Sequence, residues 1–223
     1  MRAQVITKQN TLSEQAFQKI KEDIINGKLC QGQKIGETEL AKSYGISRGP
    51  LREALHRLEY MNLVKRTPHS GSRIITLNYK MMREIYVMRE ALEGMAARLA
   101  AVNMSQIEID ALYQLLEQHA RSINETEGKE YFQTEGDLDF HYYIFSKCQN
   151  QWIIDYLENK LYQIIRMCRQ RTSREPLRPE VALKEHVNIV DAINNQDGQL
   201  AEMLMRRHIQ GAWQTMQKSL NPK

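Results

Sequence analysis

The sequence lacks the features of secreted and membrane-embedded proteins. No run of about 18 apolar residues occurs, although a membrane-spanning helix needs about 20. The N-terminal segment MRAQVITKQN lacks the apolar stretch of a secretory signal. Cys30, Cys148 and Cys168 are few, unclustered and odd in number, which argues against a disulfide framework and fits a reducing compartment. With no low-complexity tract or internal repeat either, these absences predict a cytoplasmic protein.

Charge is distributed unevenly along the 223 residues. Residues 1–77 contain 13 Lys and Arg against 7 Asp and Glu, a net charge of +6, whereas the remainder carries a net charge of −2. A basic segment followed by a mildly acidic one is typical of a nucleic-acid binder with a separate second domain. The length allows one small and one medium domain. We therefore predict domains over 1–77 and 78–223.

Residues 36–55, GETELAKSYGISRGPLREAL, have the pattern of a helix-turn-helix motif. Gly45 supplies the open backbone of the turn, and Ser47 stands where it can cap the second helix. Arg48 and Arg52 lie four residues apart, so both project from one face at the start of that helix, where a recognition helix meets DNA. The predicted apolar stripe behind them comprises Leu51, Ala54, Leu55 and Leu58. Taken alone, the spacing equally allows a helical hairpin with exposed basic residues.

The residues around this motif favour a winged helix. Two β-prone runs, Leu63–Arg66 and Arg73–Leu77, flank a turn at Pro68–Ser72 and so predict a β-hairpin. An amphipathic helix is predicted over Leu12–Asn26. Basic residues near the hairpin tip are Lys65, Arg66, His69 and Arg73. The order helix, helix, helix, hairpin predicts that residues 1–77 form a winged helix-turn-helix domain that binds double-stranded DNA.

This segment resembles the N-terminal domain of GntR-type bacterial transcription regulators. The matching residues are Ile25–Gly27, Gly32, Glu37, Leu40, Ala41, Gly45–Arg48, Pro50–Leu55, Leu58 and Gly71. Two departures are Gln31, where the family usually has Pro, and Gly49, where a small hydroxyl residue is common. Together, motif and resemblance predict an operator-binding surface made of Ser47, Arg48, Gly49, Arg52, His69 and Gly71.

From Tyr79 onward the pattern is entirely helical. Helices are predicted over Met82–Val102, Ser105–Ile123, Lys129–Lys147, Trp152–Arg171, Arg178–Asn194 and Asp197–Leu220. The run Ser105-Gln-Ile-Glu108 has the form of a capping box, in which the Glu108 side chain reaches back to the Ser105 amide. We therefore predict a mainly α protein, in which an N-terminal winged helix-turn-helix precedes an all-α helical bundle.

Four residues of the predicted bundle form a candidate metal site. Asp137 and His141 lie at i and i+4 and would share one helix face, while His186 and His208 lie on the last two predicted helices. One carboxylate and three imidazoles suit Zn²⁺, Ni²⁺, Mn²⁺ or a similar divalent ion. The alternative is that each histidine is an ordinary hydrogen-bonded core or surface residue.

A second resemblance bears on this choice. Residues 82–211 resemble the ligand-binding FCD domain of the FadR-like branch of GntR regulators. The matching residues are Arg89, Glu93, Ala96, Ala97, Leu99, Ala100, Asp137, Phe140, His141, Asn150, Glu185, His186, Ile189, Ala192, Ile193, Asp197, Ala201, Met205, His208 and Ile209. The resemblance implies that Asp137, His141, His186 and His208 bind a divalent transition metal inside the bundle.

Effectors of this family are commonly small organic acids, which can chelate such an ion. Arg89 would then clamp the anion in a bidentate manner, unless it only pairs with Glu93 at i+4. Arg166 and Arg169 are further candidates for the same role, with a solvated helix face as the alternative. The stretch YVMREALEGMAARLAA resembles regulators associated with propionate and methylcitrate catabolism. The expected effector is therefore 2-methylcitrate or a related di- or tricarboxylate.

The resulting hypothesis is a homodimeric repressor, not an enzyme. Its binding to an operator would be controlled by a carboxylate effector bound at a metal ion. One alternative is a direct sensor of the metal ion itself. Another is a metal-dependent enzyme with a DNA-binding appendage, since such a ligand set can activate water. In that enzyme, Glu93 or Glu185 would be the candidate general base, although neither is placed in register with the metal ligands.

Overall fold

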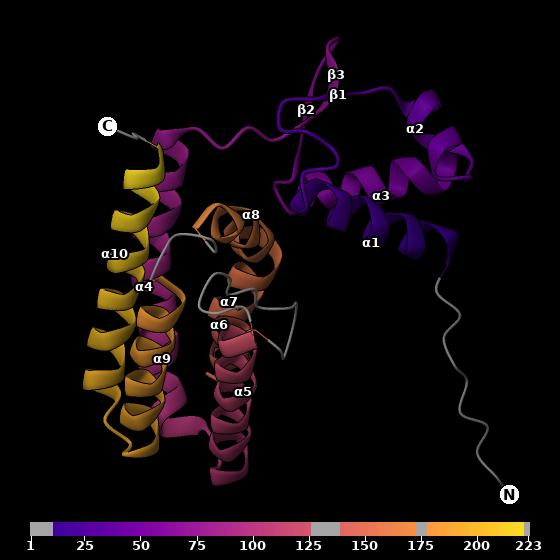
Figure 1. Ribbon diagram of the computed structural model, residues 1–223. Coiled ribbons are helices and arrows are strands. Elements are labelled where there is room, and N and C mark those ends of the chain that lie inside the picture. Colours follow the sequence, from indigo (N-terminus) through magenta and orange to yellow (C-terminus); the bar gives the residue numbers. More distant parts are fainter. Residues whose placement is uncertain (1–10, 126–138, 173–177, 221–223) are drawn as a thin grey trace, which may run out of the picture. The chain divides into compact units, whose positions relative to one another are not determined.

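The computed structural model describes residues 11–125, 139–172 and 178–220 (Figure 1). The chain divides into two compact units between Thr76 and Leu77. Within the described ranges, no helix is both long and apolar enough to cross a membrane.

The first unit contains a helical group built around an apolar interior. Its helices are α1 (Leu12–Ile25), α2 (Glu37–Ser43) and α3 (Arg48–Tyr60). Helix α3 packs against both α1 and α2. The stripe predicted for α3 is confirmed, because Leu51, Ala54, Leu55 and Leu58 are all buried. Gly45, between α2 and α3, has φ +66°, a left-handed conformation that glycine adopts without a steric penalty.

A small antiparallel sheet completes this unit. Its strands are β1 (Lys34–Ile35), β2 (Val64–Thr67) and β3 (Gly71–Ile74), in the order β1-β3-β2. The predicted hairpin is confirmed, with Val64 opposite Ile74 and Thr67 opposite Gly71. Its second strand is shifted from the predicted Arg73–Leu77, since β3 begins at Gly71, inside the predicted turn, and ends at Ile74. Strand β1 was not predicted from the sequence, since two residues are too few to show the alternation of a strand.

The second unit is a helical bundle. Its elements are α4 (Tyr79–Asn103), α5 (Gln106–Glu125), α6 (Phe140–Ser146), α7 (Gln151–Tyr156), the π-helical turn η2 (Leu157–Leu161), α8 (Tyr162–Thr172), α9 (Arg178–Asn194) and α10 (Gly198–Leu220). Helices α4, α9 and α10 run side by side in Figure 1, and α9 also packs against α5. The predicted fold class, a winged helix-turn-helix followed by an all-α bundle, is confirmed.

Two predicted helices differ from the structure. The helix predicted over Lys129–Lys147 is wrong at Asp139, which has an extended backbone and caps α6 through hydrogen bonds from the His141 and Tyr142 amides. Residues 129–138 of that prediction lie outside the described residues. The helix predicted over Trp152–Arg171 is interrupted by η2, which inserts a wider turn between α7 and α8.

The predicted capping box at the start of α5 is present. Glu108 Oε2 accepts from the Ser105 amide and from the Ser105 hydroxyl, both at 2.9 Å. The bond from the Ser105 amide and then that from its hydroxyl hold the pKa of Glu108 below its ordinary value. A lowered carboxyl pKa stabilises the fold above the unfolded-state pKa, and this contribution is lost as the pH falls through the folded-state pKa.

Replacing Glu108 with alanine should therefore lower the free energy of unfolding by about 1 kcal/mol near neutral pH. The difference from the unaltered protein should shrink below about pH 4, where carboxylates become protonated. Urea unfolding followed by circular dichroism at several pH values measures both effects. The control is Glu117→Ala on the same helix, because Glu117 is 68% exposed and only reaches Arg121 at 3.7 Å. Equal losses in the two variants would contradict the capping role.

Candidate DNA-binding face and metal centre

The basic residues predicted to read DNA lie on the first turns of α3. Arg48 Nη2 donates to Thr38 Oγ1 at 2.6 Å, and Arg52 Nε donates to Glu37 Oε2 at 2.8 Å. The Arg52 side chain is 61% exposed, so its pairing with Glu37 lies in a solvated setting. Both guanidinium groups therefore extend towards the start of α2 from one face of α3.

Two small residues flank these arginines at the start of α3. Ser47 occupies the N-cap position, but its hydroxyl makes no capping bond to the described residues, so the predicted side-chain cap is absent. Gly49 is exposed, and a Cβ added there would meet no atom within 4 Å. This end of the helix is thus open to a large partner.

The hairpin between β2 and β3 presents the predicted wing. His69 and Gly71 have φ values of +63° and +81°, which turn the chain tightly between the strands. Lys65, Arg66 and His69 are exposed. Arg73 is exposed too, and its Nη1 donates to the Gly32 carbonyl at 3.2 Å.

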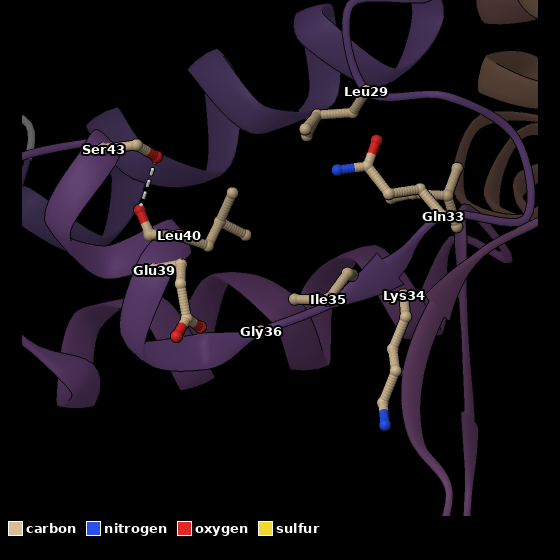
Figure 2. Close-up of a pocket in the computed structure, with 9 residues that line it drawn as sticks. Leu29, Gln33, Lys34, Ile35, Gly36, Glu39, Leu40 and Ser43 are labelled. Carbon is tan, nitrogen blue, oxygen red and sulfur yellow. Dashed lines mark hydrogen bonds between the residues drawn. The ribbon is translucent and has the colours of Figure 1, made fainter.

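The same unit contains a pocket of about 410 Å³ between β1, α2 and the loop after α1 (Figure 2). Two of the polar side chains that line it are already used inside the unit. Gln33 Oε1 accepts from the Cys30 amide at 2.9 Å, and Ser43 Oγ donates to the Leu40 carbonyl at 2.9 Å. We assign no ligand to this pocket.

In the second unit, three histidines from three helices meet in the interior. His141 on α6, His186 on α9 and His208 on α10 are 1–4% exposed. His208 Nε2 lies 3.3 Å from His141 Nε2 and 3.3 Å from His186 Nε2. One ligating nitrogen from each ring lies within 4.8 Å of the others. Asp137, predicted to share this site, lies outside the described residues.

Two carboxylates determine which nitrogen of two rings carries hydrogen. His141 Nδ1 lies 2.7 Å from Glu93 Oε2, and His208 Nδ1 lies 2.7 Å from Glu185 Oε2. Burial opposes the ionisation of Glu93, but the Arg89 charge and His141 outweigh it, and the pKa of Glu93 is well below its ordinary value. Burial likewise opposes ionisation of Glu185, while His208 and Arg178 lower its pKa overall. Since ionised carboxylates only accept hydrogen bonds, both imidazoles donate through Nδ1.

Burial also keeps the imidazoles neutral. It lowers the pKa of His208 to about 3 against the opposing effect of Glu185, and it lowers the pKa of His141 despite Glu93. The pKa of His186 lies well below its ordinary value because of burial and the neighbouring histidines. The contacts with Glu93 and Glu185 are therefore hydrogen bonds from neutral rings rather than ion pairs.

The donor set fits a metal ion. With hydrogen on Nδ1, His141 and His208 direct Nε2 lone pairs towards each other across 3.3 Å, which calls for a cation between them. Two nitrogens each about 2.1 Å from a shared tetrahedral ion would lie about 3.4 Å apart. The observed separation matches this value, so His141, His186 and His208 are suited to hold Zn²⁺ or a similar ion.

Arg89 lies next to this histidine cluster and is almost fully buried. Its Nε donates to Glu93 Oε1 at 2.7 Å, so the pairing considered as an alternative from the sequence is present. Its Nη1, however, has no hydrogen-bond partner among the described residues, and neither has the buried Tyr86 hydroxyl. The Arg89 guanidinium lies 4.9 Å from the centre of the Tyr86 ring. Buried polar groups without partners are costly, so this region is suited to an anionic ligand.

The other two predicted effector arginines have different surroundings. Arg169 Nη1 donates to Asp139 Oδ2 at 2.6 Å, and the same carboxylate accepts from the Tyr162 hydroxyl at 3.3 Å. Arg166 Nη1 donates to Gln163 Oε1 at 3.0 Å. Arg169 thus supports the capping residue of the helix that carries His141, whereas Arg166 contacts a neighbour on its own helix.

The positions of Tyr86, Glu93 and Glu185 in this site were not predicted from the sequence. The sequence offered Glu93 as a partner of Arg89 and both glutamates as possible general bases, but not as partners of histidines that are 48 and 23 residues away in the chain. The only local signals were the Arg89–Glu93 spacing and the position of Glu185 directly before His186.

Comparison with known proteins agrees with this architecture. Residues 12–74 match the model of bacterial regulatory proteins of the gntR family, and residues 84–211 match the FCD domain. The chain is 31% identical over 195 residues to the uncharacterized HTH-type transcriptional regulator YdhC of Bacillus subtilis, covering 87% of this chain and 86% of YdhC. It is 27% identical over 201 residues to the HTH-type transcriptional repressor RspR of Escherichia coli, covering 89% of this chain and 86% of RspR.

Among solved structures, E. coli McbR/YncC superimposes with a TM-score of 0.74 over 95% of this chain and 99% of that chain. The identity is 20%, so this likeness concerns the fold alone. The matching families and relatives are transcription regulators rather than enzymes.

Proposed function

Because the chain belongs to the GntR family of bacterial regulatory proteins and carries an FCD domain, we propose that it is a repressor controlled by a small carboxylate bound at a divalent metal ion. The observation that supports this most is the 3.3 Å separation of His141 Nε2 and His208 Nε2, with the buried Arg89 linked to His141 through Glu93. Such a protein would work in the cytoplasm, where it has access to operator DNA.

The DNA-binding half of the proposal uses the first unit. Arg48 and Arg52 would enter the major groove with α3, while His69 and Gly71 of the wing would approach the backbone or the minor groove. Ser47 and Gly49, at the open end of α3, would lie close to phosphates. We expect a homodimer that reads two half-sites about one helical turn apart, which sedimentation or light scattering can check.

The regulatory half uses the second unit. His141, His186 and His208 would hold the ion, and Asp137 is the proposed fourth ligand. The ion would supply a positive centre with positions that an effector carboxylate can occupy. Arg89 Nη1 and the Tyr86 hydroxyl would bind the remaining oxygens of the same effector, while Arg169 would hold Asp139 and thereby the start of α6. The effector class we propose is a di- or tricarboxylate such as 2-methylcitrate.

Control follows if the effector binds one arrangement of the dimer better than another, since it then shifts their populations. The test is fluorescence anisotropy with an operator selected from random DNA by the full-length protein. Citrate or 2-methylcitrate should weaken operator binding at least tenfold for the zinc-loaded protein and have little effect after chelation. If operator affinity changes with zinc and neither acid alters it, the protein is instead a direct metal sensor.

A further inference from the structure

Two similar series of hydrogen-bonded side chains extend from the histidine cluster. In the first, Arg89 Nε donates to Glu93 Oε1 at 2.7 Å, and the other oxygen of Glu93 accepts from His141 Nδ1. In the second, Arg178 Nη1 lies 3.0 Å from Glu185 Oε2, which also accepts from His208 Nδ1. Each series has the order Arg, Glu, His and ends on an Nε2 atom of the cluster.

Each carboxylate has a definite effect on its imidazole. It keeps hydrogen on Nδ1, so that the Nε2 lone pair points into the cluster, and it fixes the rotation of the ring. It also draws positive charge onto the ring and makes Nε2 a stronger donor to a cation. The arginine pairs with the carboxylate and holds it in place beside the ring.

The third histidine is held differently. The His186 ring stacks on Phe140 with centroids 3.8 Å apart and an interplanar angle of 16°. Packing against an aromatic ring restricts its rotation without adding charge. Glu93 on α4 and Glu185 on α9 each place a carboxylate beside one of the other two rings.

We propose that Glu93 and Glu185 are positioning residues of the metal site, each acting through one histidine ligand. The inference rests on the proposed metal site and adds the residues that set its affinity. In addition, Glu93 Oε1 accepts from Arg89 Nε, and Glu93 Oε2 accepts both from His141 Nδ1 and, at 3.4 Å, from Arg89 Nη2. An anion that draws Arg89 away would therefore also alter the support of His141. Anion binding and metal binding would then influence each other's affinity reciprocally.

Glu185 is the residue to test first, because its side chain is 31% exposed and tolerates replacement more readily than Glu93. Glu93→Gln would leave buried Arg89 without its counter-charge and should destabilise the bundle. We therefore compare Glu185→Ala, which removes the acceptor, with Glu185→Gln, which keeps a weaker neutral acceptor. Glu180→Gln is the matched control, since Glu180 is an exposed carboxylate on the same helix.

Zinc affinity of the full-length protein is measured by competition with a chromogenic chelator. We expect Glu185→Ala to bind zinc about 10- to 100-fold more weakly, Glu185→Gln to be intermediate, and Glu180→Gln to match the unaltered protein. Melting in the presence of a chelator should be similar for all four proteins, which separates this effect from a loss of folding.

A second measurement does not depend on affinity. Nitrogen-15 NMR of metal-free protein should show hydrogen on Nδ1 of His208 in the unaltered chain, and loss of that preference in Glu185→Ala. Zinc binding within twofold of the unaltered protein in Glu185→Ala, or an unchanged His208 tautomer, would overturn the inference while leaving the metal site intact. If the unaltered protein takes up no zinc, the proposed metal control fails instead, and the inference fails with it.

Discussion

Replacing His208 with alanine is expected to weaken zinc binding by about 100-fold or more. A structural zinc site contributes about 10–16 kcal/mol from four ligands, so one ligand accounts for roughly 3 kcal/mol. His208 lies at the centre of the cluster, since its Nε2 is 3.3 Å from the Nε2 atoms of both other histidines. Its loss should also remove the effect of carboxylates on operator binding, because the effector would lose its metal anchor.

The control for this prediction is His56→Ala, which removes an exposed imidazole from the first unit. His208→Gln, which fills more of the vacated space, should lose zinc as His208→Ala does. Chelator competition gives the affinities, and melting without metal reports on folding. Retention of zinc within threefold by both His208 variants, with the fold intact, would contradict the assigned ligand set.

Replacing Arg52 with alanine is expected to weaken operator binding by about 10- to 100-fold for each half-site at which the Arg52 contact to a base is lost. A bidentate contact from arginine to guanine is worth about 1–3 kcal/mol. In the free protein Arg52 is paired with Glu37, but an exposed ion pair contributes only about 0.2–1 kcal/mol, so DNA can displace it. Arg48, held by Thr38 through one hydrogen bond, should behave similarly.

The matched control lies on the same helix. Arg57 stacks over Phe17 of α1 with 3.8 Å to the ring centre and pairs with Glu14 of the same helix, so it faces α1 rather than α2. Arg57→Ala should lower stability while leaving the operator affinity of the folded fraction nearly unchanged. Operator and random DNA are compared by anisotropy at several salt concentrations. Operator binding by Arg52→Ala and Arg48→Ala within twofold of the unaltered protein would refute this recognition face.

The local features of the fold were largely predictable from the sequence. The bounds of α9 were predicted as they occur, and the capping box at Ser105 lies where the pattern indicated. Both depend on residues that are close in the chain. Periodicity also predicted which residues of α3 face the interior, because a helix repeats its faces every 3.6 residues.

What the sequence did not show depends on contacts between distant residues. Asp139 interrupts the predicted helix because it is the N-cap at which α6 begins, and it also binds Arg169, 30 residues further along the chain. Apolar residues keep a helix-like spacing through the π-helical turn at Leu157–Leu161. The sequence pattern therefore predicts one continuous helix there and does not reveal the turn. The side chain of Glu185 points to a histidine on another helix, and only the packing of α9 against α10 reveals this.

The regulatory site combines groups that would be unfavourable without a ligand. Three neutral imidazoles direct Nε2 atoms towards a common point, and a buried guanidinium keeps one nitrogen without a partner among the described residues. A metal ion with a bound carboxylate would satisfy both requirements at once. This is why the proposal links effector and metal in one site rather than assigning them to separate parts of the bundle.

The most direct measurement is elemental analysis with native mass spectrometry of the full-length protein, purified without chelator or a metal-affinity tag. The account predicts one divalent transition metal per chain, retained in a dimer and lost in His208→Ala. A protein that carries no metal, and takes up none on titration with Zn²⁺, Ni²⁺ or Mn²⁺, would contradict metal-dependent control and leave only the DNA-binding half of the account.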